Sequence, residues 1–180
     1  MTESKYIWMD GEFTPWNEAK VHVLSHTLHY GNGAIEGTKA YKTVDGRCAI
    51  FKLNEHTQRL LNSSKMTLMN VPFSLEELNK AQVELLQKNE LTNGAYIRPL
   101  VYLGYGVMGL YHKDAPVKVS ISAWEWGAYL GEEGLKKGVR VKISSFTRTP
   151  NTSGMGKAKS VANYMNSQMA KFEAVEAGYD

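Results

Sequence analysis

Two stretches near the N-terminus alternate apolar and polar residues on either side of a turn dipeptide, which is the pattern of β-hairpins. YIWMDGEFTPW turns at Asp10-Gly11, and TKAYKTVDGRCAIF turns at Asp45-Gly46. Both dipeptides tolerate the positive φ angles that tight hairpin turns require. The chain is therefore predicted to open with two hairpins.

The middle of the chain changes to the 3.6-residue spacing of helices. EHTQRLLNSSKMTLM has enough of this spacing for a helix, and Asn54 is its predicted N-cap. A second helix is predicted to begin at the capping box formed by Ser74 and Glu77 and to end near Asn93-Gly94. Two helices should thus follow the hairpins.

Strand patterns return after the second helix, in AYIRPLVYLG and PVKVSISAWEWG. Pro99 lies in the first of them, and because proline cannot donate to a sheet ladder, we expect it at an edge or a bulge. The polar, glycine-bearing residues 131–138 predict a linker, followed by a strand at 139–146. The last predicted element is a helix whose apolar positions are Met165, Met169 and Phe172.

This order of elements predicts an α+β protein rather than a regular alternation of strands and helices. Residues 1–130 are expected to form a small N-terminal domain and 131–138 an interdomain linker. Residues 139–180 are expected to begin a second domain.

The composition of the chain indicates which binding partners and which cellular compartment to expect. The formal charge of +3 comes from 21 Lys and Arg against 18 Asp and Glu, without long runs of one sign, so nucleic acid is not indicated. The single cysteine, Cys48, excludes an internal disulfide framework and fits a reducing compartment. Neither a signal-peptide pattern nor an apolar run long enough to span a membrane is present, so a cytoplasmic location is expected.

Two motifs suggest chemistry that their surroundings do not support. GYGVMG satisfies G-x-G-x-x-G, but a strand rather than a helix is predicted after it, so we expect a loop that could line a pocket. His22, His26 and His29 would share a face of a helix and could then ligate zinc. Because no cysteine or carboxylate set accompanies them, structural or pocket-lining roles are favoured, and no metal is predicted.

The stretch GMGKAKSVANYMNS places Lys159 among small residues, directly before the predicted final helix. The positive end of the helix dipole favours a neutral amine, which could form a Schiff base with a carbonyl cofactor. If that cofactor is pyridoxal 5′-phosphate (PLP), it needs a guanidinium for its phosphate and a donor near its ring oxygen. Arg59 and Tyr164 could supply them, although spacing alone does not single them out.

Five blocks stand out along the chain: HYGNGAIEGTKAY, EHTQRLLNSSK, AYIRPLVYLG, WEWGAYLG and KAKSVANYMNS. In their order and spacing they resemble the branched-chain amino-acid aminotransferases of the fold-type IV group of PLP enzymes. The resemblance implies a two-domain α+β fold in which the small α/β domain is complete and the large pseudo-barrel domain is only begun by Asp180. D-amino-acid aminotransferases and aminodeoxychorismate lyases share that fold.

The resemblance also implies roles for individual residues. Lys159 matches the lysine that holds PLP as an internal aldimine and moves the α-proton, whereas Lys157 does not occupy that place. Arg59 matches the phosphate-binding arginine and Tyr164 the tyrosine at the ring oxygen. The remaining matches concern substrate: Tyr96, Trp126 and Tyr129 as pocket walls, Arg98 as the partner of an acidic side chain, Tyr30 and Leu110 as residues that reach a neighbouring subunit's pocket, and Ile35 where the family usually has phenylalanine.

The activity implied is transamination between leucine, isoleucine or valine and 2-oxoglutarate, in a homodimer or higher homo-oligomer without nucleic acid or membrane. Two alternatives stay open at this level. The first is a non-catalytic fragment that acts only in dimer or partner contacts, because the carboxylate for the pyridine nitrogen is expected beyond Asp180. The other is a D-amino-acid aminotransferase or an aminodeoxychorismate lyase, because Ile35 departs from the family pattern.

Overall fold

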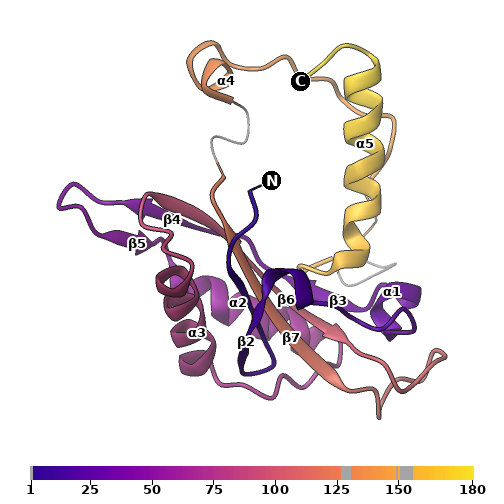
Figure 1. The fold of residues 1–180 in the computed structure, drawn as a ribbon. Coiled ribbons are helices and arrows are strands. Elements are labelled where there is room, and N and C mark those ends of the chain that lie inside the picture. Colours follow the sequence, from indigo (N-terminus) through magenta and orange to yellow (C-terminus); the bar gives the residue numbers. More distant parts are fainter. Residues whose placement is uncertain (1, 127–130, 149, 151–155) are drawn as a thin grey trace.

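A seven-stranded sheet forms the body of the protein, in a computed structural model that describes residues 2–126, 131–148, 150 and 156–180 (Figure 1). The strand order is β2-β1-β7-β6-β4-β5, and β3 also pairs with β6. The strands are β1 (Tyr6–Met9), β2 (Glu12–Pro15), β3 (Gly33–Ile35), β4 (Thr38–Lys42), β5 (Cys48–Ile50), β6 (Gly94–Leu103) and β7 (Val117–Trp124).

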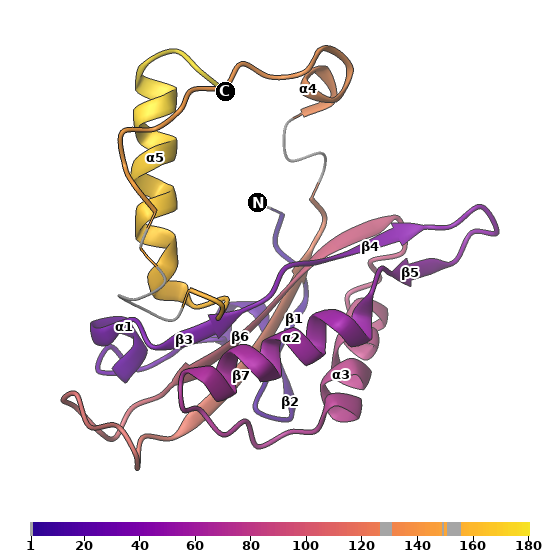
Figure 2. The same ribbon diagram turned by 180° about the vertical axis from the view of Figure 1, so that it is seen from behind.

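Strands and helices do not alternate regularly along the chain, which confirms the α+β class. Two long helices, α2 and α3, lie together on one face of the sheet. Helix α5 begins near β3 and extends away from that layer (Figures 1 and 2). The α-helices are α1 (His26–Tyr30), α2 (Leu53–Met66), α3 (Leu75–Lys88), α4 (Gly131–Lys137) and α5 (Tyr164–Glu176); η1 (Trp16–Glu18) and η2 (Val161–Asn163) are short 3-10 helices.

Both predicted hairpins form. β1 pairs with β2 around Asp10 and Gly11, whose φ angles are 49° and 105°. β4 pairs with β5, and Gly46 in the connecting loop has φ 84°. The positive φ angles explain why the turn dipeptides were informative in the sequence.

The helix boundaries were predicted less well. The capping box is confirmed, because Ser74 Oγ accepts from Glu77 N and Glu77 Oε2 accepts from Ser74 N. The N-cap of α2, however, is Lys52 in the left-handed region, not Asn54. α3 ends at Lys88 rather than near residue 93. Asn89 is its C-cap, with a side chain that hydrogen-bonds both the N–H and the C=O of Tyr6, and the chain turns away at Glu90, whose φ is 56°.

The core lies between the sheet and the layer of α2 and α3. Along β6, Ala95, Ile97 and Val101 are buried toward the helices, and the residues between them face the other side. This period of two assigns one face of β6 to packing and leaves Tyr96 and Arg98 on the face used by the site described below.

Pro99 lies in the middle of the sheet, which corrects the expected edge or bulge. Its carbonyl accepts a hydrogen bond from Glu36 N at 3.0 Å, so its nitrogen, on the same side of the strand, faces the break between β3 and β4. Residues 36 and 37 form that break. A proline is tolerated here because no ladder donor is required from it.

Two expectations about the C-terminal third were wrong in detail. Residues 131–137 of the expected linker form α4, and residues 139–146 are not a strand. No described strand pairs with that segment, which is held instead by Glu173 of α5; its carboxylate contacts Lys142 Nζ at 3.1 Å and Ser145 N at 2.9 Å. The hydrogen bond from Ser144 Oγ, together with these two contacts, lowers the pKa of Glu173 to about 2. The division into domains at 131–138 stays a prediction.

The final helix forms as predicted, but its apolar side chains are not buried by the described residues. Met165 and Phe172 are each 66% exposed, and Met169 is 41% exposed. Within the described part of the chain, no helix has both the length and the apolar character needed to cross a membrane.

Candidate active site

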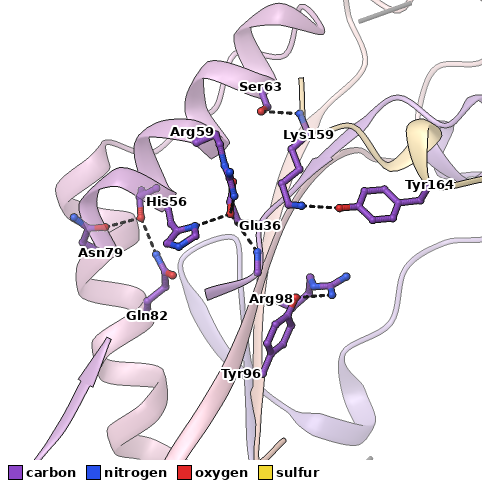
Figure 3. Close-up of polar contacts among 12 residues, drawn as sticks. Glu36, His56, Arg59, Ser63, Asn79, Gln82, Tyr96, Arg98, Lys159 and Tyr164 are labelled. Atoms are coloured by element: carbon purple, nitrogen blue, oxygen red, sulfur yellow. Dashed lines mark hydrogen bonds and ion pairs between the residues drawn. The ribbon is translucent and has the colours of Figure 1, made fainter. Parts of the chain in front are cut away.

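Lys159 is held by its backbone between α2 and β3 (Figure 3). Its N–H donates to Ser63 Oγ at 3.0 Å, and its carbonyl accepts from Ile35 N at 3.0 Å. The next residue, Ser160, forms a β-bridge with Ala34. A loop lysine thereby acquires a fixed place on the rigid part of the fold.

Replacing Ser63 with alanine should lower the free energy of unfolding by about 1 kcal/mol, because the Lys159 N–H loses its acceptor. Chemical denaturation of the variant measures this. Ser64→Ala is the matched control: this neighbouring buried serine donates only to the carbonyl of Leu60 in its own helix, so its loss should cost less. Equal costs would contradict a specific role for the Ser63 contact.

The Lys159 side chain points toward the first residue of α5. Its Nζ donates to Tyr164 Oη at 2.6 Å. Lys157, two residues earlier, is exposed, whereas Lys159 is half-buried between Ala158 and Ser160, which are both buried. The two lysines therefore differ in burial and in the contact of Lys159 with Tyr164.

Arg59 approaches the same place from α2. A cavity of about 250 Å³ is lined by Arg59, Lys159 and Tyr164, and its other lining residues are Arg148, Gly156, Lys157, Ala158, Ser160, Asn163 and Ser167. The three residues predicted to hold a cofactor thus come from segments far apart in sequence and share one cavity. Its donors include two amines, two guanidinium groups and a phenol, which suit a phosphorylated carbonyl compound.

The Arg59 guanidinium is bound to a buried carboxylate that the sequence analysis did not identify as part of the site. Arg59 Nε and Nη2 donate to the two oxygens of Glu36, the latter at 2.8 Å, and His56 Nδ1 lies 2.9 Å from Glu36 Oε2. Burial opposes the charge on Glu36, but these hydrogen bonds and the charge of Arg59 outweigh it, so its pKa lies below the ordinary value. Glu36 is therefore a carboxylate in the native protein at neutral pH.

A second cavity, of about 340 Å³, adjoins the first at Tyr164. Its other lining residues are Ile35, Arg98, Leu100, Val161 and Gln168. Arg98 Nη2 donates to Tyr96 Oη at 2.7 Å, and the Tyr96 ring packs edge-on against Trp126 at 4.8 Å. The structure thus connects four of the predicted substrate residues, Ile35, Tyr96, Arg98 and Trp126, beside the lysine site. Tyr129 lies outside the described residues.

Tyr30 and Leu110 are not brought to this site within the chain. Neither residue lines the two cavities, and Tyr30 Oη accepts from the N–H of Gly109, the residue before Leu110, at 3.1 Å. Leu110 is 86% exposed. The loop predicted at GYGVMG is confirmed, since no helix begins at its third glycine.

The three histidines do not share a helix face, because α1 begins only at His26. His26 is buried and its Nε2 lies 2.8 Å from the carbonyl of Gly109, so it anchors the loop that carries Leu110. His29 Nε2 lies 2.9 Å from the carbonyl of Val23. In the ranges that the structure describes, no group of three or more His, Cys, Asp or Glu could hold a metal ion.

One signal could have pointed to His56 and Ser63, which sequence reasoning missed. They are spaced i, i+3 and i+7 with the predicted Arg59, which places all three on one face of α2. A polar row of this kind within a packed helix indicates a buried site. No comparable signal marks Glu36, whose burial depends on the break in the sheet.

Comparisons with known proteins agree with this geometry. The family model described as Amino-transferase class IV matches residues 33–180. A branched-chain-amino-acid aminotransferase of Pseudomonas aeruginosa is 47% identical over 174 residues, which are 97% of this chain and 56% of that protein. This chain therefore spans little more than half the length of that relative.

Solved structures give the same result. A branched-chain amino acid aminotransferase from the organism abbreviated T.th., with pyridoxamine 5′-phosphate, is 46% identical, with a TM-score of 0.92 over 100% of this chain and 59% of that one. The same enzyme complexed with N-(5′-phosphopyridoxyl)-L-glutamate is 44% identical, with a TM-score of 0.91 over 100% of this chain and 58% of that one. Both likenesses extend over the strands and helices that position the lysine.

Proposed function

Because the chain belongs to the class IV amino-transferase family, we propose that it provides the lysine-bearing part of a PLP-dependent branched-chain transaminase. One observation carries the proposal: Lys159, Tyr164 and Arg59 line one cavity, with Lys159 Nζ 2.6 Å from Tyr164 Oη. An amine alone is common on protein surfaces. An amine paired with a phenol and a guanidinium in one cavity is the donor set that this cofactor needs.

The residues fit PLP by their chemistry. When bound, the cofactor supplies an electrophilic carbon and a ring that can accept the electron pair released at an amino acid's α-carbon. Lys159 would hold the cofactor through Nζ and, once freed by substrate, would carry the α-proton with the same nitrogen. Tyr164 keeps that nitrogen in place, and the guanidinium of Arg59 would bind the phosphate.

The substrates proposed are leucine, isoleucine or valine on one side and 2-oxoglutarate on the other. The cavity beside Tyr164 offers Ile35, Leu100 and Val161 to a branched apolar side chain. Arg98 could take the side-chain carboxylate of an acidic substrate: its Nε is buried and has no hydrogen-bond partner among the described residues. One of the solved relatives holds an L-glutamate adduct of the cofactor, which supports an acidic partner substrate.

The proposal includes a second copy of the chain. Tyr30 and Leu110 lie on an exposed surface away from the cavity of their own chain. We propose that they reach the corresponding cavity of a neighbouring subunit, in a homodimer or higher homo-oligomer.

The covalent site can be tested directly. The protein is incubated with PLP, reduced with borohydride, and examined by intact mass and peptide mapping. A phosphopyridoxyl group on Lys159 is the expected result, because this amine alone of the two neighbouring lysines is half-buried beside Tyr164. Modification of Lys157 instead, or no modification, would contradict the assignment.

A further inference from the structure

The position of Glu36 is fixed by a hydrogen bond of its backbone as well as by the contacts of its side chain. Its N–H donates to the carbonyl of Pro99, at the break between β3 and β4, and its side chain is only 1% exposed. A buried carboxylate must be compensated, since an isolated buried charge is costly. Glu36 is therefore a rigid and charged anchor on the sheet.

Arg59 has the opposite character. Its side chain is 55% exposed and projects from α2, so without a partner it would sample many rotamers. In the structure, Nε and Nη2 are both bound by the Glu36 carboxylate in a side-on pair (Figure 3). A two-point contact fixes the plane of the guanidinium as well as its position.

The pair leaves a defined set of donors for an anion. A guanidinium has five N–H groups, of which Glu36 takes two, so both N–H groups of Nη1 and one of Nη2 make no hydrogen bond to a described residue. Arg59 lines the cavity with Lys159 and Tyr164. His56, 2.9 Å from Glu36 Oε2, adds a further contact to the carboxylate without occupying the guanidinium.

From this geometry we infer that Glu36 is a positioning residue, which holds Arg59 in the orientation that binds the cofactor phosphate. The inference rests on the proposed function and goes beyond it, because it assigns a role to a residue that does not line the Lys159 cavity. Glu36 should therefore affect the binding of ligands that carry the phosphate and should not affect the binding of the pyridoxal ring alone.

The test compares PLP with pyridoxal, which has the same ring and aldehyde but no phosphate. Equilibrium binding of each is measured by absorbance for the unaltered protein, Glu36→Gln and Arg59→Met. We expect Glu36→Gln to weaken PLP binding roughly tenfold to hundredfold, as loss of a charge-assisted contact would. Pyridoxal binding should change little, so the preference for PLP over pyridoxal should fall toward that of Arg59→Met.

Glu55→Gln is the matched control. It also removes one carboxylate charge, but Glu55 lies on α2, is exposed, and pairs with Lys52 at the surface. This variant should keep the full preference for PLP. If Glu36→Gln does not fold, as judged by circular dichroism, Glu36→Asp takes its place, because the shorter carboxylate keeps the charge and loses the two-point reach; its preference for PLP should also fall.

The outcomes are distinguishable. Equal losses for PLP and pyridoxal, or no loss for either, would overturn the positioning role. Tighter PLP binding by Glu36→Gln would overturn it too, since the carboxylate would then compete with the phosphate for Arg59. If the unaltered protein showed no preference for PLP over pyridoxal, or formed no adduct on Lys159, the proposed function itself would fail.

Discussion

Replacing Lys159 with alanine is expected to remove covalent capture of PLP and to lower transamination of L-leucine with 2-oxoglutarate by roughly 10²–10⁴-fold from lost proton transfer alone. The reason is geometric. Among the described residues, Lys159 is the lysine whose Nζ contacts a phenol, and its backbone is held on both sides by α2 and β3. Steady-state rates and the mass after borohydride reduction measure the two effects.

Lys157→Ala is the control for this experiment, because it removes the other lysine that lines the cavity, which is exposed and lies two residues away. It should keep both the adduct and the rate. A large loss in Lys157→Ala with little loss in Lys159→Ala would show that the register of the loop is wrong. Turnover of D-alanine but not L-leucine by the unaltered protein would instead favour the related D-specific enzymes.

Replacing Gly37 with alanine should destabilise the protein by about 1–3 kcal/mol, as overpacking of a filled site does. A Cβ built on Gly37 would lie 2.0 Å from Tyr96 Oη and 2.8 Å from Tyr96 Cζ. Tyr96 cannot move freely, because it accepts from Arg98 and packs against Trp124 and Trp126. Thermal and chemical unfolding measure the loss.

A double-mutant cycle identifies the cause of that loss. In a Tyr96→Ala background the added methyl group meets no phenol, so Gly37→Ala should cost clearly less than it does in the unaltered protein. Additive costs would mean that the backbone at residue 37, and not the approach of Tyr96, requires glycine. In the single variant, displacement of Tyr96 should also weaken substrate binding more than PLP binding.

Local structure could be predicted from the sequence where it depends on neighbouring residues. The hairpins follow from Asp10-Gly11 and Asp45-Gly46, whose turns are confirmed. The start of α3 follows from the capping box at Ser74. In each case the hydrogen bonds or φ angles lie within a few residues, so the pattern carries the information.

Predictions failed where contacts between segments far apart in the sequence determine the local structure. α3 ends where the side chain of Asn89 contacts β1, and Pro99 is tolerated in a central strand because the opposite ladder breaks at residue 36. The segment 139–146 has strand-like alternation but no described partner strand. A strand needs a neighbour for its backbone groups, and one sequence does not identify that neighbour.

The candidate site shows the same division. From the residues alone, Lys159 was a candidate because of its small neighbours and the helix that follows, and the resemblance supplied Arg59 and Tyr164. Only the tertiary structure brought Glu36, His56 and Ser63 to them. The chain's sequence determined which groups could do the chemistry. The packing of α2 against the break between β3 and β4 decided their orientation, because burial and two-point hydrogen bonds arise only between segments far apart in the chain.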